Sequence, residues 1–182
     1  MNDLQKEHPQ SLPGLTELVQ YCDHRLEAAT IPDFSGAVNG LQVDHQGAVH
    51  KIGAAVDAGI ATFQQAATAG VDFLVVHHGL FWSPMQPICG KHYSKLKLLF
   101  DHNIALYSSH LPLDRHPELG NNSILAGELG LEPVTNFCPY QGCNIGLITQ
   151  GLESRKALRT AQRPATSGLP VARSGQLSYT RD

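Results

Sequence analysis

The sequence predicts an α/β fold: a mostly parallel or mixed sheet with helices on its faces, followed by a poorly ordered basic tail. Two observations lead to this fold class. Residues 71–76, VDFLVV, form an almost wholly apolar run rich in β-branched side chains, which is typical of a buried parallel strand. Residues 49–56 and 58–69 before it predict a strand and a helix, so the three segments make a βαβ unit.

The N-terminal part of the chain is predicted to reach this unit through a helix, a loop and a short strand. Apolar side chains at helical spacing predict an amphipathic helix over 15–29. Closely spaced Pro, Asp, Asn and Gly predict an irregular loop over 31–40. A strand over 41–43 and a turn over 44–47 follow, and Gly70 ends the helix of the βαβ unit.

Two more helices and two more strands are predicted after the βαβ unit. Apolar periodicity and the positions of Gly and Asn set their limits. In chain order they are a loop over 79–90, a helix over 93–102, a buried strand over 104–108, a helix over 121–129 capped by Asn121 or Asn122 and ended by Gly130, and a strand over 142–149.

Residues 151–182 differ from the rest of the chain in charge. They hold six Lys and Arg against two acidic residues, whereas residues 1–150 hold seven basic and fourteen acidic residues. Such a change of sign, in a segment with one aromatic residue, predicts a separate and poorly ordered tail. The predicted organisation is an α/β metal-binding domain over 1–150 and a basic tail over 151–182.

Composition excludes several classes of protein. Hydrophobic residues make up 42% of the chain and charged residues 16%, and no apolar run approaches the ~20 residues that a membrane span needs. The N-terminus has no leader pattern, which predicts a cytoplasmic protein. A net charge of −3 gives no basic surface for nucleic acid. The irregular spacing of the four cysteines favours free, mostly buried thiols, although Cys138 and Cys143 are close enough for a metal site.

The ten histidines are the unusual feature of the composition. His77 and His78 directly follow the buried strand, and open α/β sheets bind their ligands beyond the carboxyl ends of their strands. The next predicted strand ends in the same crevice and brings His110, Asp114 and His116 there. Imidazole and carboxylate together suit zinc, manganese, iron or nickel better than magnesium or calcium. We therefore predict a divalent-metal site with His77, His78 and Asp114 as ligands.

Several roles at this site stay open. Neighbouring strand residues face opposite ways, so His77 and His78 can reach one ion only if the chain turns there, a freedom that Gly79 supplies. Otherwise they serve two ions, or one ion and the groups around it. His110 and His116 either support the metal ligands or contact a ribose or a base.

The loop that holds Asn39, Gly40 and Gln42 has two interpretations. It lines the site, or its residues only shape the turn before the first strand.

Three strings of residues resemble one known family: VNGLQV (Val38–Val43), VVHHGLFW (Val75–Trp82) and SHLPLDRHPELGNN (Ser109–Asn122). Over Ala37–Glu132 the chain resembles the YbgI-like family of dinuclear-metal proteins, also named GTP cyclohydrolase 1 type 2 homologues. The resemblance implies a toroidal homohexamer of α/β subunits, with two metal ions inside the ring and hydrolytic chemistry. His77, His78 and Asp114 then take the positions of the family's N-terminal metal ligands.

The chain departs from the family pattern after Thr149. Family members continue into a second, similar lobe, in which a histidine and a glutamate complete the two-metal site. Here we find no further match, and no histidine follows His116. A truncated gene or a shifted reading frame would explain both observations, and the two-metal site would then be incomplete.

The predicted function is that of a metal-dependent hydrolase, in which an ion activates water and His110 shuttles protons. GTP ring opening is implied by the resemblance alone. One alternative is a metal-binding scaffold or interaction protein without turnover, and another is an inactive fragment. A general acid or base distinct from the metal ligands would favour the enzyme, and the candidates are His110, His116 and Glu118.

Overall fold

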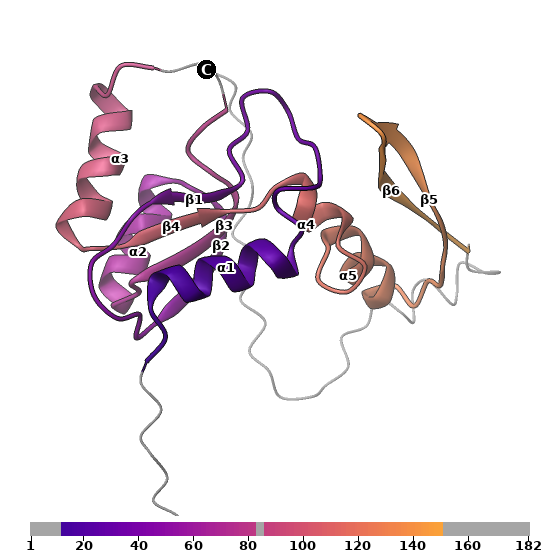
Figure 1. Cartoon of the computed structure of the whole chain (residues 1–182), viewed down its shortest axis with the longest axis horizontal. Coiled ribbons are helices and arrows are strands. Elements are labelled where there is room, and N and C mark those ends of the chain that lie inside the picture. The colour runs from indigo at the N-terminus through magenta and orange to yellow at the C-terminus, as the bar shows by residue number, and fades with distance from the viewer. Residues whose placement is uncertain (1–11, 83–85, 151–182) are drawn as a thin grey trace, which may run out of the picture.

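The computed structural model describes residues 12–82 and 86–150. Its helices and strands, labelled in Figure 1, are in chain order α1 (Leu15–Arg25), β1 (Gly40–Val43), β2 (Ile52–Asp57), α2 (Ile60–Ala69), β3 (Phe73–His78), α3 (Gly90–Asp101), β4 (Ala105–Ser108), α4 (Leu111–Arg115), α5 (Asn121–Glu128), β5 (Pro133–Tyr140) and β6 (Cys143–Thr149).

The main sheet has four strands in the order β1-β4-β3-β2. The strands β2, β3 and β4 run parallel, and β1 pairs antiparallel with β4. The predicted α/β class with a mixed sheet is therefore confirmed, and the predicted βαβ unit is β2-α2-β3. The tail predicted over 151–182, and with it the domain boundary at residue 150, lies outside the described residues.

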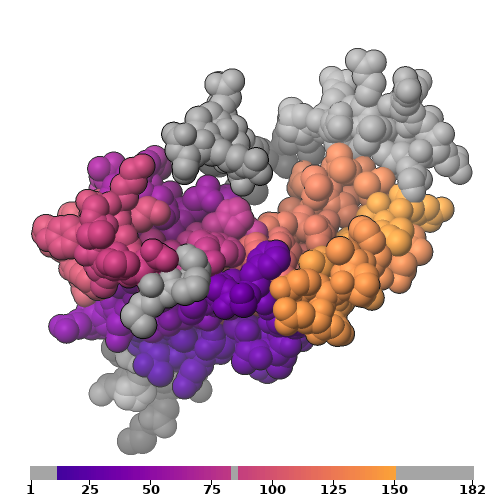
Figure 2. All heavy atoms as spheres, turned by 90° about the horizontal axis from the view of Figure 1, so that it is seen from above, coloured from indigo at the N-terminus to yellow at the C-terminus, as the bar shows by residue number. Residues whose placement is uncertain are grey.

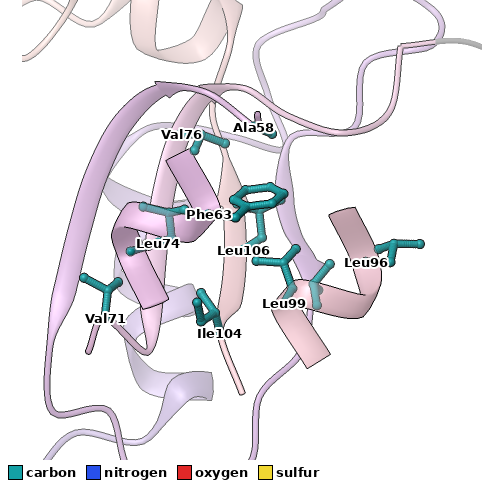
Figure 3. Close-up of a cluster of buried hydrophobic side chains, with 11 residues drawn as sticks. Ala58, Phe63, Val71, Leu74, Val76, Leu96, Leu99, Ile104 and Leu106 are labelled. Atoms are coloured by element: carbon teal, nitrogen blue, oxygen red, sulfur yellow. The ribbon is translucent and has the colours of Figure 1, made fainter. Parts of the chain in front are cut away.

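Both faces of the sheet are covered by helices. On one face Phe63 of α2 and Leu99 of α3, both fully buried, pack with Leu74 of β3 in one hydrophobic cluster, which Figure 3 shows. On the other face Leu15 of α1 packs with Phe73 of β3. Neighbouring residues of β3 thus enter different cores, which explains why this strand is apolar without alternation.

The structure confirms one predicted helix limit and corrects two others. Gly70 follows α2 with φ of 67°, in the left-handed region, as predicted. The first helix ends at Arg25 instead of residue 29, because Glu27 has φ of 53° and interrupts it. Gly120, not Asn121 or Asn122, is the N-cap of α5, and no side chain caps this helix.

A two-stranded hairpin of β5 and β6 lies at the end of the molecule away from α3 (Figures 1 and 2). The prediction included β6 but not β5, whose sequence holds Pro133 and Pro139. Proline weakens a strand prediction because it lacks a backbone N–H, but a strand paired on one side tolerates it. Gln141 and Gly142, with φ of 45° and 88°, form the two-residue turn between the strands. The short helix α4 was also not predicted.

The cysteines are free, as predicted, but Cys89 and Cys138 are exposed, so the expectation of mostly buried thiols is wrong. In the part of the chain that the structure describes, no helix has the length and apolar character needed to cross a membrane.

Candidate metal centre

The candidate metal centre lies beyond the carboxyl ends of two neighbouring parallel strands. β3 ends at His78, and β4, which pairs with it, ends at Ser108. His110 is the residue before α4, and Asp114 lies within that short helix. Because parallel strands end at the same edge of a sheet, residues that are far apart in sequence meet here.

The side chains of His77, His78 and His110 gather in one place. Each offers one nitrogen atom, and the three atoms lie within 4.8 Å of one another. The ring centroids of His77 and His78 are 4.5 Å apart, and that of His110 lies 4.9 Å from His77 and 5.7 Å from His78. The two neighbouring histidines therefore do reach a common space at the strand end. Because imidazole is a good donor for divalent transition metals, this three-histidine group could hold such an ion.

A hydrogen bond engages the Nδ1 atom of each imidazole. The acceptors are the Ser109 carbonyl for His77 (3.0 Å), Asp57 Oδ1 for His78 (2.6 Å) and Asp33 Oδ1 for His110 (2.9 Å). Because carbonyl and carboxylate oxygens only accept, Nδ1 carries the proton in each ring. The lone pair of Nε2 is then left for a metal, which is the usual arrangement of histidine ligands. Among the described residues, Nε2 of His78 and of His110 has no hydrogen-bond partner.

Asp114 lies beside the three-histidine group. Its Oδ1 is 3.6 Å from Nε2 of His77, and 24% of its side chain is exposed. Asn121 donates a hydrogen bond to the same oxygen at 2.7 Å. The structure thus brings His110 to the two histidines that the sequence predicts as ligands, and keeps the third predicted ligand, Asp114, next to His77.

Gly79 is needed at the strand end for a reason that differs from the prediction. Its φ is not in the left-handed region, so backbone freedom does not explain it. A Cβ at this position would instead lie 2.6 Å from Gln42 Oε1 and 2.7 Å from Ser108 Oγ. Glycine therefore allows the side chain of Gln42 in β1 to pack closely against the end of β3.

Two carboxylates that the sequence analysis did not select orient the histidines. Asp57 ends β2 and lies opposite His78 in the parallel pairing of β2 and β3. Asp33 lies in the loop after α1, and only 5% of its side chain is exposed. The strand-end rule that identified His77 also points to Asp57, which directly follows the strand predicted over 49–56. No sequence signal identified Asp33.

Asp33 accepts hydrogen bonds from four residues. Besides His110, its donors are the Asn39 side chain and the backbone N–H groups of Phe34 and Leu111. Burial alone would raise the pKa of Asp33, but these hydrogen bonds outweigh burial and lower the pKa. Asp33 therefore stays ionised and fixes both the backbone at the start of α4 and the ring of His110.

We expect Asp33→Asn to lower the free energy of unfolding by about 2 kcal/mol near neutral pH, because the amide cannot accept from all of these donors. Since folding lowers the pKa of Asp33, its contribution is present above the ordinary pKa of about 3.9 and is lost as pH falls through the lowered value. Urea unfolding near pH 7 and pH 3 measures both effects. Asp101→Asn, on an exposed pair with Lys97, is the control and should cost under about 0.5 kcal/mol. An equal loss in the two variants would contradict the prediction.

The side chains of Asn39 and Gln42 hold the backbone around the site, and Gly40 and Gln42 lie in β1 rather than in the predicted loop. Asn39 Oδ1 accepts from the backbone N–H of His110 at 2.7 Å. Gln42 Oε1 accepts from the backbone N–H of Leu80 at 2.7 Å, and its Nε2 donates to the Val38 carbonyl at 2.6 Å. The segment therefore does more than shape the turn before β1, because its side chains hold the backbone on both sides of the histidines.

His116 is turned away from the three-histidine group. It is 6% exposed, its Nδ1 accepts from the backbone N–H groups of Glu118 and Leu119, and its Nε2 donates to the Arg25 carbonyl. Glu118 pairs with the side chain of Arg25. Both residues therefore join the end of α1 to the α4–α5 connection and lie apart from the candidate centre.

A cavity of about 430 Å³ adjoins the centre through Asp114. Its wall combines residues of α4, the start of α5 and the β5–β6 hairpin, among them Arg115, Asn122 and Thr135. The Asn122 amide donates to the carbonyls of Asp114 and Ile145, which ties the helices to the hairpin. A volume of this size suits a small-molecule ligand.

The fold and the site together define a class: an α/β protein with a histidine-rich, potential metal centre at the carboxyl ends of its parallel strands. A model of the Duf34/NIF3 family (NGG1p interacting factor 3) matches residues 15–178. The chain belongs to this family, in agreement with the resemblance seen in its sequence.

Known relatives match the chain over about half of their length. A "GTP cyclohydrolase 1 type 2 homolog" of Deinococcus radiodurans is 40% identical over 134 residues, which are 74% of this chain and 50% of that protein. The crystal structure of TTHA1606 from Thermus thermophilus is 49% identical with a TM-score of 0.64, and covers 71% of this chain and 52% of its own. The structure of protein ybgI, of unknown function, is 43% identical with the same TM-score, over 68% of this chain and 50% of its own.

The chain thus spans about half the length of the curated relatives that it matches. The family model continues to residue 178, past Thr149, where the family's sequence motifs gave no further match. The expectation that family likeness stops at Thr149 is therefore wrong.

Proposed function

We propose that this chain binds a divalent transition-metal ion through His77, His78 and His110, with Asp114 as a further ligand, and acts as a metal-dependent hydrolase. The observation that carries the proposal is the meeting of three imidazoles whose Nδ1 atoms are already engaged. Zinc, manganese, iron and nickel are the candidates, since they accept mixed nitrogen and oxygen donors. Such an ion, when bound, lowers the pKa of a water molecule and so supplies a nucleophile near neutral pH.

His110 has two roles that exclude each other. The sequence assigns it to proton transfer, whereas its place in the three-histidine group supports a ligand role. One Nε2 lone pair cannot hold a metal and take up a proton at the same time. A His110→Ala variant separates the roles, because loss of a ligand lowers metal content and loss of a proton carrier lowers turnover alone.

The substrate is proposed as a small molecule, with nucleotides as one candidate class. The cavity beside Asp114 supports a ligand of this size. The relatives' name makes GTP the first compound to test. We also propose, from the resemblance, that the chain assembles with copies of itself into a ring and acts in the cytoplasm.

A second candidate function, metal binding without turnover, is favoured by one observation. Of the three groups considered as a general acid or base, His116 is buried among backbone partners, Glu118 pairs with Arg25, and His110 lies in the histidine group. A scaffold or metal store needs no such group.

Metal content and turnover, measured on the same preparation, test both candidates. We expect about one ion per chain after dialysis against zinc or manganese, and hydrolysis of GTP or another nucleotide only by the metal-loaded protein. Equal turnover by metal-loaded and chelator-stripped protein would contradict the hydrolase proposal. Stable metal content without turnover of any nucleotide would favour the scaffold.

A further inference from the structure

We propose that Phe34 and Trp82 form a binding site for a planar heteroaromatic ring, such as a nucleobase, beside the three-histidine group. The inference rests on the proposed function and names the class of ligand that the centre would take. No motif in the sequence analysis assigned a role to either side chain.

Both aromatic rings lie against one imidazole of the candidate centre. The ring centroid of Phe34 is 5.7 Å from that of His110, with an angle of 35° between the ring planes. The ring of Trp82 meets His110 edge to face, with centroids 4.8 Å apart, and lies 5.9 Å from His78. Phe34 comes from the loop before β1 and Trp82 from the loop after β3, so the fold brings them together at the histidines.

The two rings are exposed although the His110 imidazole that both of them contact is not. Phe34 is 52% exposed and Trp82 is 40% exposed, whereas the side chain of His110 is 13% exposed. Single exposed aromatic side chains are common, but these two expose their rings side by side with a potential metal centre, where a ligand has access to them. The two rings form an exposed apolar surface beside the three-histidine group.

A hydrogen bond to the Trp82 ring, backbone hydrogen bonds of Phe34 and an aromatic contact restrain these exposed side chains. The indole Nε1 of Trp82 donates to the Gly79 carbonyl at 2.8 Å. The backbone N–H of Phe34 donates to Asp33 Oδ1 at 2.7 Å, and its carbonyl accepts from Ala37 at 2.8 Å. Tyr140 meets Phe34 edge to face, with centroids 5.6 Å apart. A ring that is already fixed loses less conformational entropy when a ligand stacks on it.

The chemistry of this surface selects a flat, conjugated ligand. Aromatic side chains bind the π face of any base, and loss of one stacking partner weakens binding by about 10-fold or more. Neither a sugar phosphate nor a simple phosphate ester has such a face. The site therefore adds recognition of a ring next to the place where the ion would act.

Trp82 is the only tryptophan of the chain, so its emission reports directly on this site. The test titrates guanosine, and separately ribose 5-phosphate, into the full chain in metal-free and metal-loaded form, with excitation where guanosine does not absorb. We expect guanosine to quench Trp82 emission and ribose 5-phosphate to leave it unchanged. Phe34→Leu should weaken guanosine binding by about 10-fold or more. Phe100→Leu, at a 64% exposed position of α3, is the matched control and should bind as the wild type does.

Three outcomes would overturn the inference: no quenching by guanosine, equal quenching by ribose 5-phosphate, or equal weakening by Phe100→Leu. Emission that changes with protein concentration and not with guanosine would also overturn it, because a second copy of the chain would then cover Trp82. Metal content of Phe34→Leu, measured separately, should equal that of the wild type. Protein that binds guanosine but takes up no zinc or manganese after dialysis would refute the proposed function and leave the stacking site standing.

Discussion

His77→Ala is expected to weaken binding of zinc or manganese by more than about 100-fold, because loss of residues that merely support a metal ligand already costs about 10- to 100-fold. His77 has its ring centroid within 5 Å of both other histidines and its Nε2 3.6 Å from Asp114, so it touches every other member of the proposed ligand set. No remaining donor replaces its nitrogen. Titration of metal-free protein with a competing chromophoric chelator gives the dissociation constant.

His102→Ala is the matched control for this variant. His102 is exposed at the end of α3, away from the three-histidine group, and its replacement should leave the dissociation constant within about two-fold of the wild type. A circular dichroism spectrum of each variant checks that both are folded. If His77→Ala keeps wild-type affinity, or His102→Ala loses as much, the assignment of the metal centre is wrong.

The core of the site could be predicted from sequence because it depends on a rule of topology. Parallel strands end at one edge, so the residues that follow two neighbouring strands must meet. His77 and His78 follow VDFLVV, and His110 follows IALYS, so their proximity is a consequence of strand order. The rule does not decide which of the gathered side chains has a nitrogen or oxygen aimed at a common point. The prediction therefore placed Asp114 among the ligands, and the structure gathers His110 with the histidine pair.

The parts that could not be predicted depend on contacts between irregular segments. Asp33 meets His110 across 77 positions of sequence, and its loop has no periodicity from which a direction could be inferred. His110 and His116 occur in the same string of residues and lie at the two ends of α4. His110 joins the three-histidine group, whereas His116 contacts the end of α1. Gly79 shows the same limit, since sequence suggests freedom of φ and only the packed structure reveals that a Cβ would displace the side chains of Gln42 and Ser108.

Gly120→Ala is expected to lower the free energy of unfolding by about 3 kcal/mol or more. A Cβ on Gly120 would lie 2.7 Å from the Leu113 carbonyl and 2.8 Å from the Asp114 carbonyl, and closer still to that of His116. All three neighbours are backbone atoms, so no change of rotamer relieves the overlap and the α4–α5 connection must move. Because that connection directly follows α4, which carries Asp114, the variant should also lose metal affinity. Urea unfolding and metal titration measure the two effects.

Gly127→Ala separates this steric effect from the general cost of replacing a glycine. Gly127 lies on the exposed side of α5, and a Cβ there meets no atom within 4 Å. Alanine is the better helix former, so this variant should be unchanged or more stable by about 0.5–1 kcal/mol, with wild-type metal affinity. The two glycines are seven positions apart, Gly120 directly before α5 and Gly127 within it, yet the expected changes have opposite signs. If Gly120→Ala unfolds at the same urea concentration as Gly127→Ala, Gly120 does not pack closely against the three carbonyls. The position of Asp114, which depends on that packing, would then be wrong as well.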